Sequence, residues 1–343
     1  MLVFIVAAVL KIAIAIGITF GIAAYATLAE RKIAGFIQNR YGPNRVGPWG
    51  LFQPIADGLK LFFKEELMPD GANPWLFRIA PALVAGPALL AVAVIPFGDS
   101  IEVAGEKIPL VVADMPVGII YLLAITSLSV YGILLGGWSS NNKYSLLGGL
   151  RAAAQVVSYE LTMVLAIVTV LLFSGSMSTR EIVASQAGLW NVFKFPVGTG
   201  AFILFWIAAF AETNRLPFDM VECEPELVGG YHTEYSSMKF ALFFVGEYVA
   251  MFVQSSMLVT LFLGGHKLFG LEHIFGIPAL NAVLGAGIFI VKALFFMFVF
   301  IWVRWTLPRV RWDQLMRLGW KVMLPISLVL VLLGGGGVLL GIY

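Results

Sequence analysis

Besides Lys11, whose long stem can bring its charge to the membrane surface, three ionisable side chains lie in stretches of the sequence that are otherwise apolar. Glu160, Glu247 and Lys292 each fall within a run of about 20 apolar residues, the length that crosses a membrane. An ionisable group at mid-membrane costs about 2.5–3.5 kcal/mol on insertion scales, so each needs a physical reason. Glu160 follows Tyr159, and Glu247 shares a helical face with Gln254. Such carboxyl groups can exchange protons with water held by polar neighbours. The alternative is an ion pair that only fixes helix packing.

A second set of carboxylates is concentrated in one connector, 212–237. It holds six acidic residues against a single Arg or Lys, Arg215. The six are Glu212, Asp219, Glu222, Glu224, Glu226 and Glu234. The connector also holds Leu216, Phe218 and Leu227, which a solvated acidic tail would lack. Neighbouring carboxylates titrate as a coupled set, which suits them to gather protons or to sense a nearby charge. An exposed acidic loop is the alternative interpretation.

Few residues of the chain are suited to metal or redox chemistry. One cysteine, Cys223, excludes a disulfide and a cysteine-ligated iron–sulfur cluster within the chain. The three histidines, His232, His266 and His273, do not form a pattern such as HExxH. We therefore expect no metal site and no redox centre in this chain, so any redox chemistry must come from partners.

The elements that position these residues are membrane helices. The chain is 60% hydrophobic and 12% charged, whereas a soluble domain carries roughly a quarter charged residues. We predict a single all-α polytopic membrane domain over 1–343, without a cleavable signal peptide. The eight predicted spans are 2–28, 75–97, 114–137, 152–174, 196–211, 239–264, 280–303 and 320–342.

The distribution of basic residues predicts the orientation. Arg and Lys favour the connectors after the first, third, fifth and seventh spans by about three to one, which places those connectors in the cytoplasm. An even number of spans then places both termini in the periplasm. We also predict an amphipathic helix over 50–66 in the first connector, with Leu51, Ile55 and Phe62 on one face and Asp57 and Lys60 on the other. Such a helix lies in the membrane interface. A weaker surface helix is expected over 178–191.

Long motifs in this chain resemble one family. The first connector, AERKIAGFIQNRYGPNRVGPWGLFQPIADGLKLFFKEE (29–66), is similar to the first cytoplasmic loop of the H subunit (mitochondrial subunit 1) of respiratory complex I, the proton-pumping NADH:quinone oxidoreductase. NNKYSLLGGLRAAAQVVSYE (141–160) resembles its third loop and fourth helix. AETNRLPFD (211–219) and ECEPELVGGYHTEYSSMKFA (222–241) resemble its acidic loop and sixth helix. The resemblance covers essentially the whole chain.

The resemblance implies a role. In this family the subunit anchors the electron-transfer arm to the membrane arm, forms much of the quinone chamber, and links that chamber through glutamates to antiporter-like subunits. FMN and the iron–sulfur clusters belong to partner subunits. The residues that match the quinone site are Glu30, Arg31, Asp57, Lys60 and Phe218. Those that match the coupling path, with Asp219 and Lys292 added as candidate charges, are Tyr159, Glu160, Glu212, Asp219, Glu222, Glu224, Glu226, Glu234, Glu247 and Lys292.

The resemblance therefore predicts a subunit of a bacterial inner-membrane enzyme whose partners are other complex I subunits, quinone and membrane lipid, and not nucleic acid. Two alternatives remain at this point. A membrane-bound hydrogenase, or another donor:quinone oxidoreductase, shares the first-loop motif. A proton-coupled secondary transporter is the alternative of another class, although the broken helices and paired halves typical of transporters are not evident.

Overall fold

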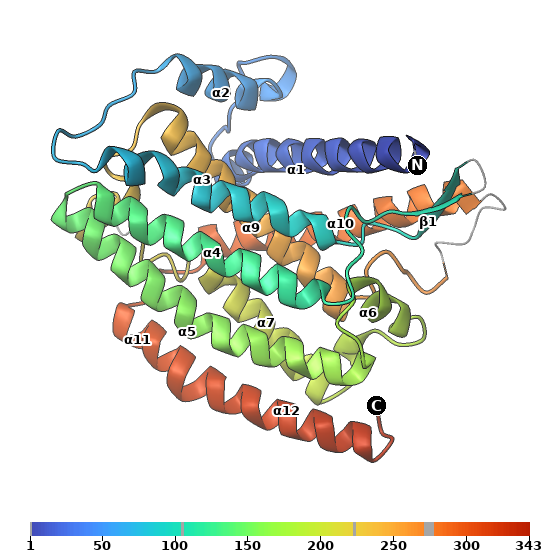
Figure 1. Cartoon of the computed structure of the whole chain (residues 1–343). Coiled ribbons are helices and arrows are strands. Elements are labelled where there is room, and N and C mark those ends of the chain that lie inside the picture. Colours follow the sequence, from blue (N-terminus) through green and yellow to red (C-terminus); the bar gives the residue numbers. More distant parts are fainter. Residues whose placement is uncertain (1, 104–105, 222–223, 271–277) are drawn as a thin grey trace.

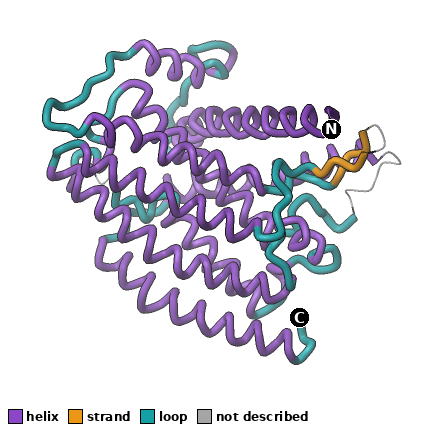
Figure 2. Tube along the Cα trace, viewed as in Figure 1, coloured by secondary structure: helices purple, strands orange, loops and turns teal. Residues whose placement is uncertain are grey.

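The computed structural model describes residues 2–103, 106–221, 224–270 and 278–343, and these residues form a helical bundle (Figures 1 and 2). Within them, seven helices are long and apolar enough to cross a membrane. They are α1 (Leu2–Ile37), α3 (Pro74–Ala91), α4 (Gly118–Ser139), α5 (Lys143–Ser174), α9 (Ser237–Phe262), α10 (Pro278–Thr306) and the continuous helix of α11 (Trp312–Arg317), a π-helical segment (Leu318–Met323) and α12 (Leu324–Leu339). The all-α polytopic prediction is confirmed.

A shorter apolar helix, α7 (Val197–Glu212), accounts for the fifth predicted span. Its 16 residues reach about 24 Å at 1.5 Å per residue, a little less than the hydrocarbon thickness of about 30 Å. Helix α7 packs against α5, α9 and α12 inside the bundle. Both termini lie at the same end of the bundle in Figure 1, as eight crossings require.

The remaining elements are short. They are the helices α2 (Gln53–Phe63), α6 (Thr179–Ser185) and α8 (Glu224–Leu227), the 3-10 turns Pro48–Gly50, Val92–Val94, Asn191–Phe193 and Gly230–His232, and the strands β1 (Ser100–Val103) and β2 (Glu106–Pro109). The amphipathic prediction over 50–66 is met by α2, and α6 is shorter than the predicted surface helix. The antiparallel pair β1–β2, in which Ser100 faces Pro109, was not predicted.

Several helices extend beyond the apolar runs that predicted them. The first helix continues to Ile37, past Glu30, Arg31 and Lys32, and the fourth span begins at Lys143 rather than at 152. The Asn142 side chain accepts a hydrogen bond from the Tyr144 N–H and so caps the start of α5. In these extensions Glu30, Arg31 and Arg151 have ion-pair partners, so polarity does not end the helix. As a result Glu160 lies near the middle of α5, not near its start.

Helix α9 is the centre of the packing. It contacts α1, α3, α7 and α10, and 72% of its most apolar 18-residue window is buried, against 17% for α1. Small residues permit the close approach that membrane helices need. A Cβ added to Gly246 of α9 would lie 3.0 Å from Val84 and 3.2 Å from the Ala85 backbone on α3. The carboxylate of Glu247 is therefore carried by the most enclosed helix of the bundle.

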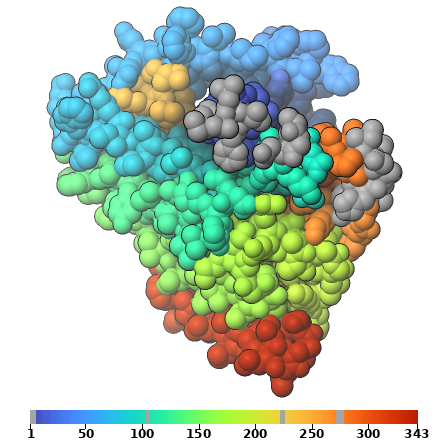
Figure 3. Space-filling view, turned by 45° about the vertical axis from the view of Figure 1, so that its right-hand side comes forward, coloured from blue at the N-terminus to red at the C-terminus, as the bar shows by residue number. Residues whose placement is uncertain are grey.

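Helix α2 lies at the edge of the bundle, against α9 and α1, at the end opposite the termini (Figure 1). Its attachment is polar: the Ser237 hydroxyl donates to the Leu61 carbonyl, 3.1 Å away, and Lys239 pairs with Glu66. In the space-filling view the molecule narrows from the side that carries α1 and α2 toward the C-terminal helix α12 (Figure 3).

Candidate functional site

A buried cluster of charges joins four segments of the bundle. Glu30 near the end of α1 and Arg215 after α7 are 6% and 2% exposed. Arg215 Nη1 lies 2.9 Å from Glu30 Oε2, and its Nε lies 2.5 Å from Glu247 Oε1 of α9. Arg304, at the end of α10, pairs with Glu30 Oε1 at 2.5 Å. We call Glu30, Arg215, Glu247 and Arg304 the charge cluster.

The charge cluster is neutral as a whole, with two carboxylates and two guanidinium groups. Tyr248 completes it, because its hydroxyl donates to Glu30 Oε2 at 2.8 Å and its ring lies 4.4 Å from the Arg215 guanidinium carbon. Buried charges are tolerated only when they are paired and hydrogen-bonded. Since Arg215 contacts both glutamates, a change in the charge of either one must be felt by the other.

The predicted quinone-site residues separate into two groups around the end of α1. Glu30 points into the charge cluster, whereas its neighbour Arg31 turns outward and binds Asp57 of α2 at 2.6 Å. Lys60 lies 3.9 Å from the same carboxylate and is largely exposed. The bond between Arg31 and Asp57 therefore ties α2 to α1, and the sequence had not indicated this pair.

The apolar face of α2 is uncovered in this chain. Ile55, Leu59, Phe62 and Phe63 are 53–80% exposed, and no residue of α2 is buried. Phe218, the remaining quinone-site candidate, is instead 7% exposed and packs against the Tyr159 ring with centroids 5.6 Å apart. The Tyr159 hydroxyl donates to the Leu315 carbonyl, 2.9 Å away. Phe218 and Tyr159 are thus core neighbours rather than parts of an open surface.

The acidic connector is held against the bundle through its side chains. Asp219 pairs with Arg309 at 3.0 Å, Glu226 pairs with Arg151 at 2.6 Å, and Glu234 accepts from the Asn142 amide at 2.7 Å. Glu224 begins α8, and Glu222 lies outside the described residues. These pairs tie the connector to α5 and to the segment after α10, so the described part does not behave as a free acidic loop.

Burial also affects a histidine of this connector. Burial lowers the pKa of His232 from 6.5 to about 4, although the nearby Asp219 carboxylate acts in the opposite direction. Loss of solvation thus outweighs the favourable charge, as expected for an imidazole with most of its surface against protein. His232 is therefore neutral in the fold at physiological pH.

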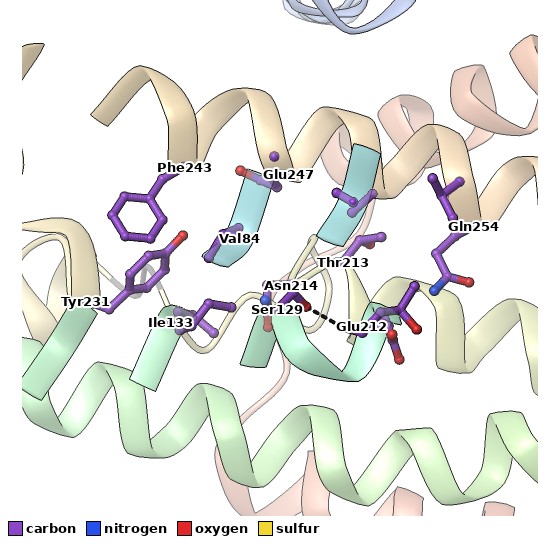
Figure 4. A pocket seen from close by; sticks show the side chains of 16 residues that line it. Val84, Ser129, Ile133, Glu212, Thr213, Asn214, Tyr231, Phe243, Glu247 and Gln254 are labelled. Carbon is purple, nitrogen blue, oxygen red and sulfur yellow. Dashed lines mark hydrogen bonds between the residues drawn. The ribbon is translucent and has the colours of Figure 1, made fainter. Parts of the chain in front are cut away.

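A small cavity lies beside Glu247 of the charge cluster (Figure 4). Its volume is about 50 Å³, and it is enclosed by α3, α4, α9 and the turn after α7. The polar residues that line it are Thr126, Ser129, Glu212, Thr213, Asn214, Tyr231, Glu247 and Gln254. A site for one water needs roughly 10–15 Å³ by this measure, so the cavity has room for about three. Glu247 and Glu212 therefore share one space that is large enough for water.

Glu160 and Lys292 lie near the path in different ways. Glu160 accepts a hydrogen bond from Ser127 of α4, which is next to the cavity residue Thr126. The Lys292 ammonium instead donates to the carbonyls of Leu263, Gly265 and Lys267, at 2.6–3.0 Å, and lies over the Trp190 ring. The structure therefore places Lys292 at the C-terminal end of α9, where a cation stabilises exposed carbonyls, and not beside Glu247.

Sequence reasoning brought out the acidic residues better than their partners. Arg304 was only one of the basic residues whose distribution predicted the orientation. Neither Tyr248 nor Ser127 was predicted to take part in the site. The signal for Tyr248 was its position beside Glu247, and an arginine at the end of an apolar helix was the signal for Arg304. Among the described residues, no group of three or more His, Cys, Asp or Glu side chains is arranged to hold a metal ion.

The fold and the site define a multi-pass membrane protein whose interior carries paired charges beside a small cavity with several polar side chains in its wall. The family model described as NADH dehydrogenase matches residues 10–335. The proteins named as the H subunit of NADH-quinone oxidoreductase from Flavobacterium johnsoniae and Leptospira biflexa are 46% and 50% identical to the chain, over 98% and 90% of it and 96% and 88% of their own lengths. A Geobacter sulfurreducens protein, named as H subunit 1 of NADH-quinone oxidoreductase, is 54% identical over 91% of the chain and 89% of its own length.

The chain belongs to the family of NADH-quinone oxidoreductase H subunits. The predicted resemblance is confirmed, and the secondary transporter has no support. The chain is accordingly a membrane subunit of an enzyme complex.

Proposed function

We propose that this chain forms much of a quinone-binding chamber and couples quinone reduction to proton translocation through its carboxylates. The quinone and the electron donor NADH are inferred from the name of the relatives. The observation that carries the proposal is the position of Arg215, which contacts Glu30 at the α2 end of the bundle and Glu247 at the mouth of the cavity.

The chamber is proposed at α2. A quinone combines a polar headgroup with a long apolar tail, so its site needs apolar walls that are open to lipid and polar groups at one end. The exposed apolar face of α2 suits the tail, and the Arg31–Asp57 pair with Lys60 suits the polar end. Phe218 is kept in this proposal as a further residue of the chamber, held in place by its contact with Tyr159.

The coupling is electrostatic in this proposal. Reduction of a quinone to its quinol takes two electrons and two protons, so charge arrives at the headgroup before protons compensate it. A unit charge about 10 Å away changes the proton affinity of a carboxylate by about 1.7 kcal/mol at an effective dielectric constant of about 20. That change is more than tenfold in an equilibrium constant, which is enough to alter the balance within the charge cluster.

The response then passes inward along the acidic residues. Glu30, Arg215 and Glu247 form the first step, the cavity leads to Glu212, and Ser127 leads from the cavity wall on α4 to Glu160. The connector residues Asp219, Glu222, Glu224, Glu226 and Glu234 and the side chain Tyr159 supply charge and support along the path, and Lys292 anchors the far end of α9. FMN and iron–sulfur clusters would be held by partner subunits.

In this proposal the complex lies in the bacterial inner membrane, with α2 on the cytoplasmic side and both termini in the periplasm. Its partners would be the hydrophilic quinone-site subunits, the antiporter-like membrane subunits and lipid. An electron donor other than NADH, as in a hydrogenase-type complex, would leave the role of this chain unchanged.

The proposal is tested with Glu247→Gln and Glu212→Gln in the assembled complex reconstituted into vesicles. Loss of a titratable group should lower NADH:quinone reduction and proton pumping together, by about a hundredfold, the lower end of the 10²–10⁴ range for a positioned acid or base. The exposed Glu181→Gln on α6 is the matched control and should change neither. Unchanged reduction and pumping in both buried variants would refute the coupling role.

A further inference from the structure

Two buried oxygen atoms of the cavity have no hydrogen-bond donor among the described residues. They are Oε2 of Glu212 and Oε1 of Gln254. Gln254 is 2% exposed, and its amide extends toward the end of the cavity where Glu212 lies (Figure 4). Leaving such an acceptor without a donor is unfavourable, so buried polar atoms almost always have a partner.

Three of the hydroxyl groups that line the cavity, those of Thr126, Ser129 and Thr213, do not supply the missing donors. Thr126 Oγ1 donates to the Leu123 carbonyl at 3.1 Å, and Ser129 Oγ donates to the Thr126 carbonyl at 2.7 Å. The third hydroxyl, on Thr213, donates to the Ala209 carbonyl at 2.9 Å. Each of these hydroxyl protons is used within its own helix or turn, so the oxygens are left to face the cavity as acceptors. A molecule inside the cavity would supply the donors that Glu212 Oε2 and Gln254 Oε1 lack.

Distance along α9 gives a second reason for such a molecule. Gln254 follows Glu247 by seven residues, which is two helical turns or about 10.5 Å. The two side chains therefore reach opposite parts of the cavity, and no direct hydrogen bond can join them. The volume of about 50 Å³ is sufficient for about three waters, and each water brings two donors.

We propose that Gln254 is a positioning residue that holds a water molecule against the Glu212 carboxylate at the inner end of this cavity. The water donates one hydrogen bond to Gln254 Oε1 and one to Glu212 Oε2, and further waters extend toward Glu247. Gln254 does not itself transfer a proton; its fixed amide orients the water that faces Glu212. This inference rests on the proposed function and assigns the residue that completes its path between the two glutamates.

The first test is direct observation of the water in the intact complex. A cryo-electron microscopy map that resolves ordered waters should show density within 3.2 Å of both Gln254 Oε1 and Glu212 Oε2 in the wild type, the usual outer limit for a hydrogen bond of about 3.2 Å. The same density should be absent in Gln254→Met, which keeps the side-chain length but has no amide. An empty cavity in the wild type, or density that persists unchanged in Gln254→Met, would overturn the proposal.

The second test measures turnover in vesicles that contain the assembled complex. Gln254→Met should lower uncoupler-stimulated quinone reduction and pumping by about tenfold, as expected when a water loses one of its buried partners. It should also change the solvent isotope effect in D₂O. Gln254→Asn, which keeps the amide and admits a further water, should recover most of both rates. Wild-type rates and isotope effect in Gln254→Met would overturn the proposal.

Two controls test for a general disturbance of α9 and for a bound cation. Ser256→Ala lies on the same helix, is fully buried with no partner for its hydroxyl among the described residues, and does not line the cavity. It should leave both rates and the isotope effect unchanged. Because the lining oxygens would also suit a sodium ion, turnover is compared with and without Na⁺. A requirement for Na⁺ would mean that a cation and not a water occupies the site, and would overturn the proposal.

Failure of this inference differs from failure of the proposed function. If Glu212→Gln leaves pumping unchanged while the map shows the water held by Gln254, the coupling path is wrong and the water site stands. If Glu212→Gln abolishes pumping while Gln254→Met does not affect it, the path stands and the role of Gln254 is overturned.

Discussion

Replacement of Arg215 by methionine should disturb the charge cluster more than any other single substitution in it. Arg215 is 2% exposed and contacts both Glu30 and Glu247. After Arg215→Met, Glu30 keeps Arg304 and the Tyr248 hydroxyl, but the ion pair of Glu247 with Arg215 is lost. Removing one partner of a buried pair costs about 3–5 kcal/mol. Since Glu247 borders the cavity and water can relieve part of its charge, we expect about 3 kcal/mol, near the lower end of that range.

A double-mutant cycle isolates the interaction between the two residues. Glu247→Gln alone leaves Arg215 paired with Glu30 and should cost about 1 kcal/mol, the value of an ordinary hydrogen bond. The double variant Arg215→Met with Glu247→Gln restores neutrality, and we expect it to cost about 2 kcal/mol rather than the sum, a coupling within the usual 0.5–3 kcal/mol for residues in contact.

The assay is the free energy of unfolding of the purified chain in detergent, together with the amount of assembled complex in the membrane. Arg215→Lys, which keeps the charge but not the planar fork, is a matched control and should lie between the wild type and Arg215→Met. Additive effects of the two substitutions, to within about 0.5 kcal/mol, would show that Arg215 and Glu247 do not interact and would refute the reasoning.

Two further predictions concern the packing and the connector. The pKa of His232 is about 4 in the fold and about 6.5 in an unfolded chain, so the unfolded state binds more protons between these values. Lowering the pH from about 6.5 toward 4 should therefore reduce the melting temperature, whereas His232 should contribute nothing above about pH 6.5. The variant His232→Gln should show a weaker dependence of the melting temperature on pH. An identical pH profile in both proteins would contradict the prediction. In Gly137→Ala the added Cβ would lie 2.4 Å from the Ser145 carbonyl oxygen, so we expect a loss of about 1–3 kcal/mol in unfolding free energy, whereas Gly86→Ala, with nothing within 4 Å, should lose nothing.

At the proposed chamber, the sequence pattern predicted helix α2 but not the contacts of its side chains. The amphipathic pattern predicted the helix, its two faces and its place in the first connector, because the 3.6-residue period of apolar residues is a local property of the sequence. It did not indicate that Arg31 would bind Asp57 while the adjacent Glu30 turned inward. Neighbouring residues on a helix point about 100° apart, and which of them meets a partner depends on helices far along the chain.

In the rest of the molecule, too, the sequence predicted the elements and the fold determined which side chains meet. The sequence alone determined the membrane class, the positions of the helices, the family resemblance and the acidic residues, since apolar run length and composition are local quantities. Only the tertiary structure decided the partners: Arg304 beside Glu30, Ser127 beside Glu160, the carbonyl cage around Lys292, and a cavity shared by Glu212, Glu247 and Gln254. A buried charge constrains the sequence to supply a partner somewhere, but helix packing alone determines which residue is within reach.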